Sequence, residues 1–130
     1  MEIKKHKPLV YLCGSFNGPE YYKAFEDMED ELTAMGCNPM SPARLPNGLT
    51  TAQRHRITAA MIDSADAVVM IPGWQADEAA VWEHHLAYCF DRPIVELREG
   101  DPFGGEKYPE SIVHAWLRHD LEEALGEVSA

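Results

Sequence analysis

The sequence of 130 residues has no apolar run long enough to span a membrane, and it has no internal repeat. Its first seven residues are polar and basic, without the apolar stretch of a secretory signal, so we expect a cytoplasmic protein with no membrane partner. Basic residues are also few, because 11 Lys and Arg stand against 22 Asp and Glu. The resulting formal charge of -11 repels a phosphate backbone, and a nucleic-acid polymer is therefore not an expected partner.

Cysteine is sparse as well, and its spacing fits neither a disulfide framework nor a metal centre. Cys13, Cys37 and Cys89 lie far apart in apolar contexts, which predicts reduced thiols in the core. Neither a C-x-x-C nor an H-E-x-x-H spacing occurs, so we expect no metal site. The sequence has no clear signature of a flavin site either, and no cofactor is predicted.

The loop that follows the first apolar run, residues 14–19, lacks the common phosphate-binding fingerprints. It has neither the Gly-Lys-Ser/Thr ending of a Walker loop nor a G-x-G-x-x-G pattern, and Pro19 stands where a cysteine phosphatase has Arg. What remains is a short turn bounded by Gly14 and Gly18. Its backbone amides and the Ser15 hydroxyl are expected to face a small ligand.

The sequence does contain a regular alternation of short apolar runs and segments with helical periodicity. The runs that we predict as strands are 9–13, 37–40, 67–71 and 93–97. The predicted helices are 20–35, 51–63, 77–90 and 109–125, with Thr50 or Thr51 capping the second of them. This order predicts one α/β domain over residues 1–130, with three layers, α/β/α, around a parallel sheet of four or five strands, as in flavodoxin-like and Rossmann-like folds.

The periodicity also predicts which faces of the first two helices are buried. The apolar stripe of the first helix consists of Tyr22, Phe25, Met28 and Leu32. The apolar side of the second helix consists of Ile57, Ala60 and Met61.

One charged residue conflicts with the apolar face of the predicted helix 77–90. The apolar residues of this face are Ala79, Ala80, Leu86, Ala87 and Phe90, and Glu83 lies in their midst. An unpaired carboxylate there would leave water with nothing to offset the cost. A helix that follows a strand in an α/β fold begins at the carboxyl edge of the sheet, where such folds bind ligands. We therefore predict that Glu83 lies in a binding crevice; the alternatives are a rotated helix that exposes Glu83, or a structural hydrogen bond.

The order of several short motifs resembles the nucleoside 2-deoxyribosyltransferase-like superfamily. The matching pieces are Tyr11-Leu12-Cys13-Gly14-Ser15, Ala65-Asp66, Pro72-Gly73-Trp74, and a Glu six positions after Asp77. The resemblance covers about residues 9–111. This superfamily includes the deoxyribosyltransferases, the nucleoside 5′-monophosphate N-glycosidases and an uncharacterised branch with the Pro-Gly-Trp signature, which this sequence resembles most.

The resemblance implies roles for individual residues. Glu83 is expected to attack the anomeric carbon of the sugar, and Tyr11 is expected to hold Glu83 in place. The residues expected to contact the substrate are Gly14, Ser15, Asn17, Gly73, Trp74, Asp77 and Ser111. Because the superfamily takes the Ser111 contact from a neighbouring subunit, the resemblance also implies a homo-oligomer.

One position departs from the pattern of the superfamily. These enzymes place an Asp on the helix before the Ala-Asp pair, seven or eight positions before its Asp, where it handles the proton of the departing base. Counting seven back from Asp66 reaches Ala59. Asp63 lies one turn toward the wrong end of the helix, whereas His55 lies one turn toward the crevice, and histidine is a common proton donor in enzymes. We therefore add His55 to the predicted catalytic residues.

The predicted activity is cleavage or transfer of the N-glycosidic bond of a (deoxy)nucleoside through a glycosyl-enzyme intermediate. One alternative is a nucleoside 5′-monophosphate N-glycosidase, and the other is a nucleoside- or nucleotide-binding protein without turnover. Asp77 stands where the monophosphate hydrolases have Ser, and its charge favours an uncharged 5′-hydroxyl. Neutralisation by Arg44, Arg54 or Arg56 would weaken that preference.

Overall fold

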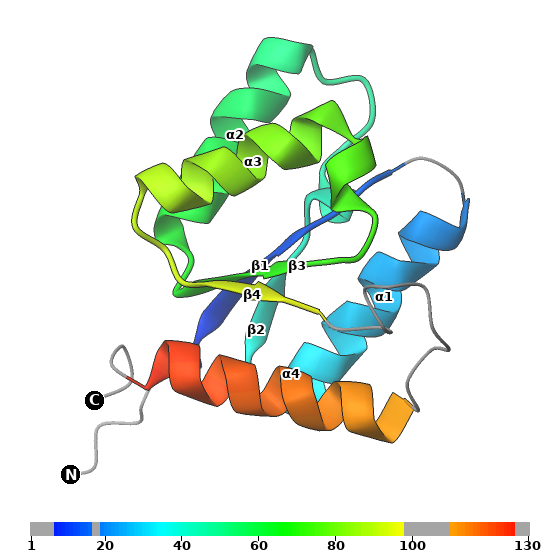
Figure 1. The fold of residues 1–130 in the computed structure, drawn as a ribbon. Helices are drawn as coiled ribbons and strands as arrows, with labels where there is room; N and C mark the ends of the chain where they lie inside the picture. The colour runs from blue at the N-terminus through cyan, green and yellow to red at the C-terminus, as the bar shows by residue number, and fades with distance from the viewer. Residues whose placement is uncertain (1–6, 17–18, 98–109, 127–130) are drawn as a thin grey trace, which may run out of the picture.

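Four parallel strands form one sheet in the order β2-β1-β3-β4 (Figure 1). The strands are β1 (Leu9–Cys13), β2 (Asn38–Met40), β3 (Ala67–Met70) and β4 (Ile94–Glu96). The computed structural model describes residues 7–16, 19–97 and 110–126. The predicted α/β class and parallel sheet are confirmed, with four strands in the described part of the chain.

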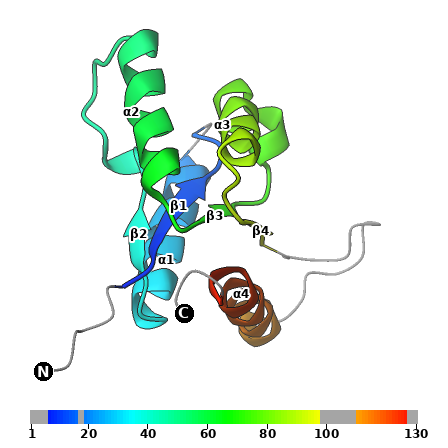
Figure 2. The same cartoon turned by 90° about the vertical axis from the view of Figure 1, so that its left-hand side faces the viewer.

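Two helices cover each face of the sheet, which gives the predicted three layers (Figures 1 and 2). The helices are α1 (Pro19–Ala34), α2 (Thr51–Ser64), α3 (Glu78–Cys89) and α4 (Glu110–Leu125), with short 3-10 helices η1 (Pro42–Arg44) and η2 (Trp74–Ala76). α1 and α4 lie on one face, and α2 and α3 lie on the other. Within the described residues, no helix is both long and apolar enough to cross a membrane.

Side chains of the central strand alternate between the two helical layers. Val10 and Leu12 belong to the apolar cluster with α1 and α4, whereas Tyr11 and Cys13 belong to the cluster with α2 and α3. Because of this period of two, the phenol of Tyr11 points into the layer that contains Glu83.

The chain leaves the two central strands, β1 and β3, in opposite directions. From β1 the chain passes to β2 at one edge of the sheet, and from β3 it passes to β4 at the other edge. Cys13 and Met70 pair at the carboxyl ends of the two central strands. In open α/β sheets such a point leaves a crevice beyond the strand ends, and ligands bind there.

The buried face of α2 differs from the predicted face. Thr58 and Ile62 are buried, whereas Ile57 and Ala60 are exposed. The Thr58 hydroxyl donates a hydrogen bond to the carbonyl oxygen of Arg54 at 2.9 Å, so its burial leaves no unpaired hydroxyl. The prediction followed the larger apolar side chains, and this rotated the helix by one residue, or about 100°.

Two other side chains predicted in the core lie at the surface. Cys89 is exposed, while Cys13 and Cys37 are buried as expected. Cys89 follows the buried Ala87 by two residues, and this spacing turns it to the far side of the helix. Tyr22 is 46% exposed, and its hydroxyl donates a hydrogen bond to the carbonyl oxygen of Ala43 at 3.3 Å.

Gly14 ends β1 at a point where α1 and the chain after β3 come close. A methyl group on its Cα would lie 3.1 Å from Cβ of Ile71 and 3.2 Å from Cζ of Phe25. Glycine is therefore required here by packing, and this requirement is independent of any contact with a substrate.

We expect Gly14→Ala to lower the free energy of unfolding by about 1–3 kcal/mol, because the added methyl overpacks this junction. Urea unfolding followed by circular dichroism measures the change. An unchanged transition midpoint would contradict the proposed close packing.

Candidate active site

The centre of the candidate site is a buried pair formed by β1 and α3. The Tyr11 hydroxyl donates a hydrogen bond to Oε1 of the Glu83 carboxylate. Tyr11 is fully buried and Glu83 is 5% exposed. The carboxylate therefore neither points to solvent nor stands unpaired, which explains how a charged residue is accommodated on the apolar face of α3.

The surroundings of Glu83 raise its affinity for a proton. Burial raises the pKa of Glu83 to about 7, while the hydrogen bond from Tyr11 opposes the rise. The charge of Asp77 adds to the rise, and the charge of Arg54 opposes it. Burial and the charge of Glu83 raise the pKa of Tyr11 well above its ordinary value, so the phenol stays a donor. Near neutral pH the Glu83 carboxyl is thus divided between acid and carboxylate.

Cys13 lies beside this pair but does not act as a thiolate. Its Sγ donates to the carbonyl oxygen of Ala80 at 3.4 Å. Burial, followed by the charge of Glu83, raises the pKa of the Cys13 thiol far above its ordinary value. The thiol therefore stays protonated and packs against α3.

Asp77 joins the two loops that leave the sheet at the crevice. Its Oδ1 accepts hydrogen bonds from the backbone N–H groups of Ala79 at 2.9 Å and Ala80 at 3.1 Å, which makes Asp77 the N-cap of α3. Its Oδ2 accepts a hydrogen bond from the backbone N–H of Phe16 at 3.4 Å. One carboxylate thus holds the loop after β1 against the helix that carries Glu83.

A cleft of about 320 Å³ opens beside this pair, and its size lies at the small end of the range for small-molecule sites. Its walls include Phe16, Leu45, Asn47, Arg54, Asp77 and Glu83. Apolar side chains and a few charged groups from four parts of the chain therefore converge on the crevice at the strand ends.

The structure brings only some of the predicted site residues to this cleft. Glu83 and Asp77 line it, and Tyr11 reaches it through Glu83. Gly14, Ser15, Gly73 and Trp74 are not among its walls: Ser15 is buried, Gly73 turns the chain in a left-handed conformation with φ of 93°, and Trp74 stacks on His84 at 4.5 Å. Asn17 and the side chain of Ser111 lie outside the described part of the structure.

His55 does not line the cleft either, because its ring stacks on Trp82 with 4.3 Å between the ring centroids. The residue of α2 that reaches the cleft is its neighbour Arg54. The guanidinium of Arg54 lies over the Phe16 ring, 5.6 Å from the ring centroid. A prediction that placed Thr58 on the buried face of α2 would also have placed Arg54 there, since Arg54 stands four residues before Thr58. By contrast, Arg44 forms an ion pair with Glu29 at 2.9 Å.

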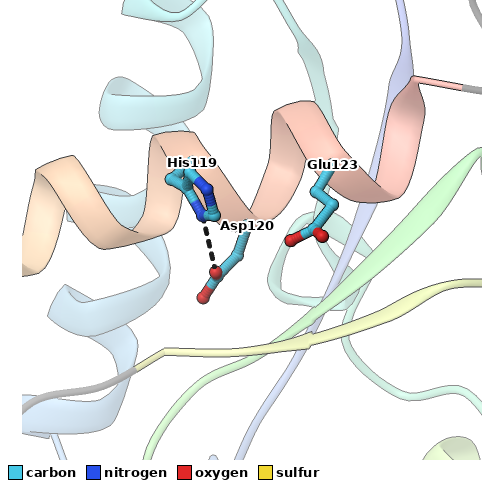
Figure 3. A group of neighbouring side chains, drawn as sticks. All are labelled: His119, Asp120 and Glu123. Atoms are coloured by element: carbon cyan, nitrogen blue, oxygen red, sulfur yellow. Dashed lines mark hydrogen bonds and ion pairs between the residues drawn. The ribbon is translucent and has the colours of Figure 1, made fainter.

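A second group of ionisable side chains lies on the opposite layer of the fold. His119, Asp120 and Glu123 of α4 place one ligand atom each within 4.8 Å of one another (Figure 3). His119 Nδ1 lies 3.3 Å from Oδ1 of Asp120. His119 and Glu123 are exposed, and α4 is separated from α3 by the sheet. This group therefore has no part in the chemistry of the Glu83 cleft.

Most of the chain, including the candidate site, matches a known protein family. A family model described as "Domain of unknown function (DUF4406)" matches residues 8–96. The chain belongs to the DUF4406 family. The matched region contains Tyr11, Arg54, Asp77 and Glu83, so the candidate site lies inside the family domain. No curated protein matches the chain.

Several solved structures share the fold of this DUF4406 domain. The 2-deoxyribosyltransferase of Bacillus psychrosaccharolyticus is 23% identical, with a TM-score of 0.59 over 68% of this chain and 70% of that chain. BlsM is 18% identical, with a TM-score of 0.71 over 98% and 97% of the two chains. The CMP N-glycosidase BcmB of Clostridium botulinum is 18% identical, with a TM-score of 0.56 over 68% and 69%. These structures confirm the fold that the resemblance implied; the Pro-Gly-Trp branch stays a prediction.

The raised pKa of Glu83 makes the stability of the fold depend on pH. Folding raises this pKa from an ordinary value of 4.5 to about 7. Between these values the folded state holds a proton that the unfolded state has released, so stability falls as pH rises through this window. The full difference corresponds to about 3 kcal/mol.

We therefore expect Glu83→Gln to raise the free energy of unfolding by up to about 3 kcal/mol at pH 8, and by much less at pH 5. Glu26→Gln, on the exposed side of α1, is the matched control and should change stability little at either pH. Urea titrations at the two pH values measure the difference. The same gain at both pH values would show that the carboxylate of Glu83 is not penalised by burial.

Proposed function

We propose that this DUF4406 domain cleaves or transfers the N-glycosidic bond of a (deoxy)nucleoside, with Glu83 as nucleophile. The observation that carries the proposal is the buried Glu83 carboxylate, held by the Tyr11 hydroxyl, in the wall of a small cleft. Two solved structures with this fold are a 2-deoxyribosyltransferase and a CMP N-glycosidase, which supports the same class of substrate.

The reaction needs a carboxylate next to the anomeric carbon. Breaking the glycosidic bond leaves positive charge on the sugar, and an adjacent carboxylate stabilises that charge and then forms a glycosyl ester. Tyr11 holds Glu83 through Oε1 and so restricts its rotamer, and the second carboxylate oxygen is proposed to attack the anomeric carbon. Water, or the nitrogen of a second base, then displaces Glu83 from the anomeric carbon.

Two further parts of the proposal concern the substrate contacts and the assembly. Ser15, Gly73 and Trp74, together with Asn17, are proposed to contact the substrate in a complex whose loops differ from those of the free protein. Ser111 is proposed to enter the site from a second copy of the chain. Analytical ultracentrifugation decides whether the protein is a homo-oligomer, and a strictly monomeric species would exclude the shared site.

The second candidate is a protein that binds nucleosides without turning them over. It is favoured by α2, where Ala59 carries no acidic group and His55 is stacked on Trp82. Incubation with a panel of deoxynucleosides, followed by chromatography of the free bases, separates this candidate from the enzyme. Binding without release of any base would favour the binding protein.

For the enzyme, we expect base release that depends on the ionised form of Glu83. The rate at low substrate concentration should rise with pH and level off above an apparent pKa of about 7. Glu83→Gln should abolish release. Tyr11→Phe should lower the rate about 10- to 100-fold through loss of a hydrogen bond to a charged group, and should shift the pH profile upward, because that bond lowers the pKa of Glu83. Release that survives in Glu83→Gln would refute the assignment of the nucleophile.

Asp77 should also influence the 5′ end of the substrate. We expect a deoxynucleoside to bind about tenfold more tightly than its 5′-monophosphate, because two like charges in the cleft repel each other and Arg54 offsets only part of this. Asp77→Ser should narrow the difference while keeping a side chain that caps α3. Calorimetric titration of both ligands against both proteins measures this. Tighter binding of the monophosphate by the unaltered protein would favour the 5′-monophosphate N-glycosidase instead.

A further inference from the structure

The cleft beside Glu83 has an unusual set of groups for the cleavage of a glycosidic bond. A departing base carries away the electron pair of the broken bond, and enzymes commonly supply a proton to it. Among the described residues that line the cleft, the carboxyl groups are those of Asp77 and Glu83. Glu83 must lose its proton to attack, and both oxygens of Asp77 are already engaged by the three backbone N–H groups that donate to them. Neither carboxyl is placed to protonate the base.

The helix α2 does not provide an acid that could protonate the departing base. Ala59 has no ionisable group, and the ring of His55 is stacked on Trp82 away from the cleft walls. The Thr58 hydroxyl is buried, and it donates to the Arg54 carbonyl oxygen. What α2 does present to the cleft is the side chain of Arg54, which stays protonated under all ordinary conditions.

The position of Arg54 suits a role toward the base. Its guanidinium is held over the Phe16 ring and forms no ion pair within the described part of the chain. It is close enough to Glu83 and Tyr11 for its charge to act on both. A planar group with five N–H donors fits the oxygen and nitrogen acceptors of a base that gains negative charge.

We propose that the cleft is specialised for nucleosides whose base departs as an anion, with Arg54 stabilising that anion in place of a proton donor. This inference rests on the proposed function. A Glu83 oxygen forms a bond to C1′, the bond from C1′ to the base nitrogen breaks, and its electron pair leaves with the base. The negative charge is shared by the ring nitrogen and the carbonyl oxygens, which accept from the Arg54 N–H groups. The free base later takes a proton from water.

The chemical class that fits is an acidic oxo-base such as uracil or thymine. Adenine is a poor leaving group unless one of its ring nitrogens is protonated, and the described cleft has no group placed to do this. A base that is already cationic would be repelled by Arg54. The cleft therefore favours bases that leave as anions and carry carbonyl oxygens to accept from Arg54, and among such pyrimidines the more acidic base leaves faster.

The test measures how the rate depends on the leaving base. The substrates are 2′-deoxyuridines with hydrogen, methyl, fluorine or bromine at position 5, and deoxyadenosine. We expect kcat/KM to rise steadily as the acidity of the released pyrimidine rises, and deoxyadenosine to react at least about 100-fold more slowly than deoxyuridine, the lower range for a missing general acid. Deoxyadenosine cleaved as fast as deoxyuridine would overturn the inference while leaving the proposed function intact.

Variants of Arg54 then identify its role. At a pH well above the pKa of Glu83, where the carboxyl is ionised with or without Arg54, Arg54→Gln should lower kcat/KM for deoxyuridine about 100-fold, with a smaller loss for the 5-fluoro substrate and no loss for deoxyadenosine. Arg54→Lys should restore part of the rate. Arg56→Gln is the matched control, since Arg56 is exposed on the same helix. Melting temperatures verify that each variant is folded.

The possible outcomes separate the two proposals. An equal loss for every base in Arg54→Gln would overturn the inference, because it would place Arg54 at the sugar or at Glu83 instead of at the base. Release of no base from any substrate by the unaltered protein would overturn the proposed function and the inference with it.

Discussion

The hydrogen bond between Tyr11 and Glu83 is the interaction on which the arrangement of β1 and α3 depends. A carboxylate removed from water loses several kcal/mol of solvation, and a single phenolic donor returns only part of it. The pKa of Glu83 therefore stays raised, at about 7, even though its partner is well placed. Because of this residual penalty, the Glu83 carboxyl is divided between acid and carboxylate at neutral pH, and the apolar packing of the two central strands must offset the penalty.

Two carboxylates near the start of α3 have different roles because their surroundings differ. Asp77 stands at the N-terminus of the helix, where free backbone N–H groups and the helix dipole stabilise its charge. Glu83 stands inside the helix, where the backbone N–H groups are already used, and its carboxylate is held by the side chain of Tyr11. The first carboxylate holds the loop after β1 in place, and the second is left with an oxygen that can react.

Local patterns in the sequence predicted the helices and strands but not the order in which the strands pair. The alternation of elements and the conflict at Glu83 could be read from the chain, because burial imposes a period of two on strands and of about 3.6 on helices. The order of the strands could not, since it depends on long-range pairing. The phase of α2 was wrong because Thr58 is buried with its hydroxyl bonded to the helix backbone, and a count of apolar residues does not detect that. His55 was predicted because it lies one turn from Ala59 toward the crevice, and its stacking on Trp82 joins residues too far apart for any local pattern to show.

The charge that α2 brings to the cleft determines which chemistry is easiest there. A carboxylic acid at this point would donate a proton to the base, but once ionised it would raise the pKa of Glu83 further, as Asp77 already does. Arginine has the opposite effect on both reactants: it gives no proton, and its charge favours the carboxylate form of the nucleophile. An acid on α2 would help the base to leave by protonating it. A cation there would help the base to leave by stabilising its negative charge, and would also lower the pH at which Glu83 is ionised. The two effects reinforce each other only when the base can carry negative charge, so Arg54 links the proposed choice of base to the ionisation of Glu83, whose pKa is raised mainly by burial.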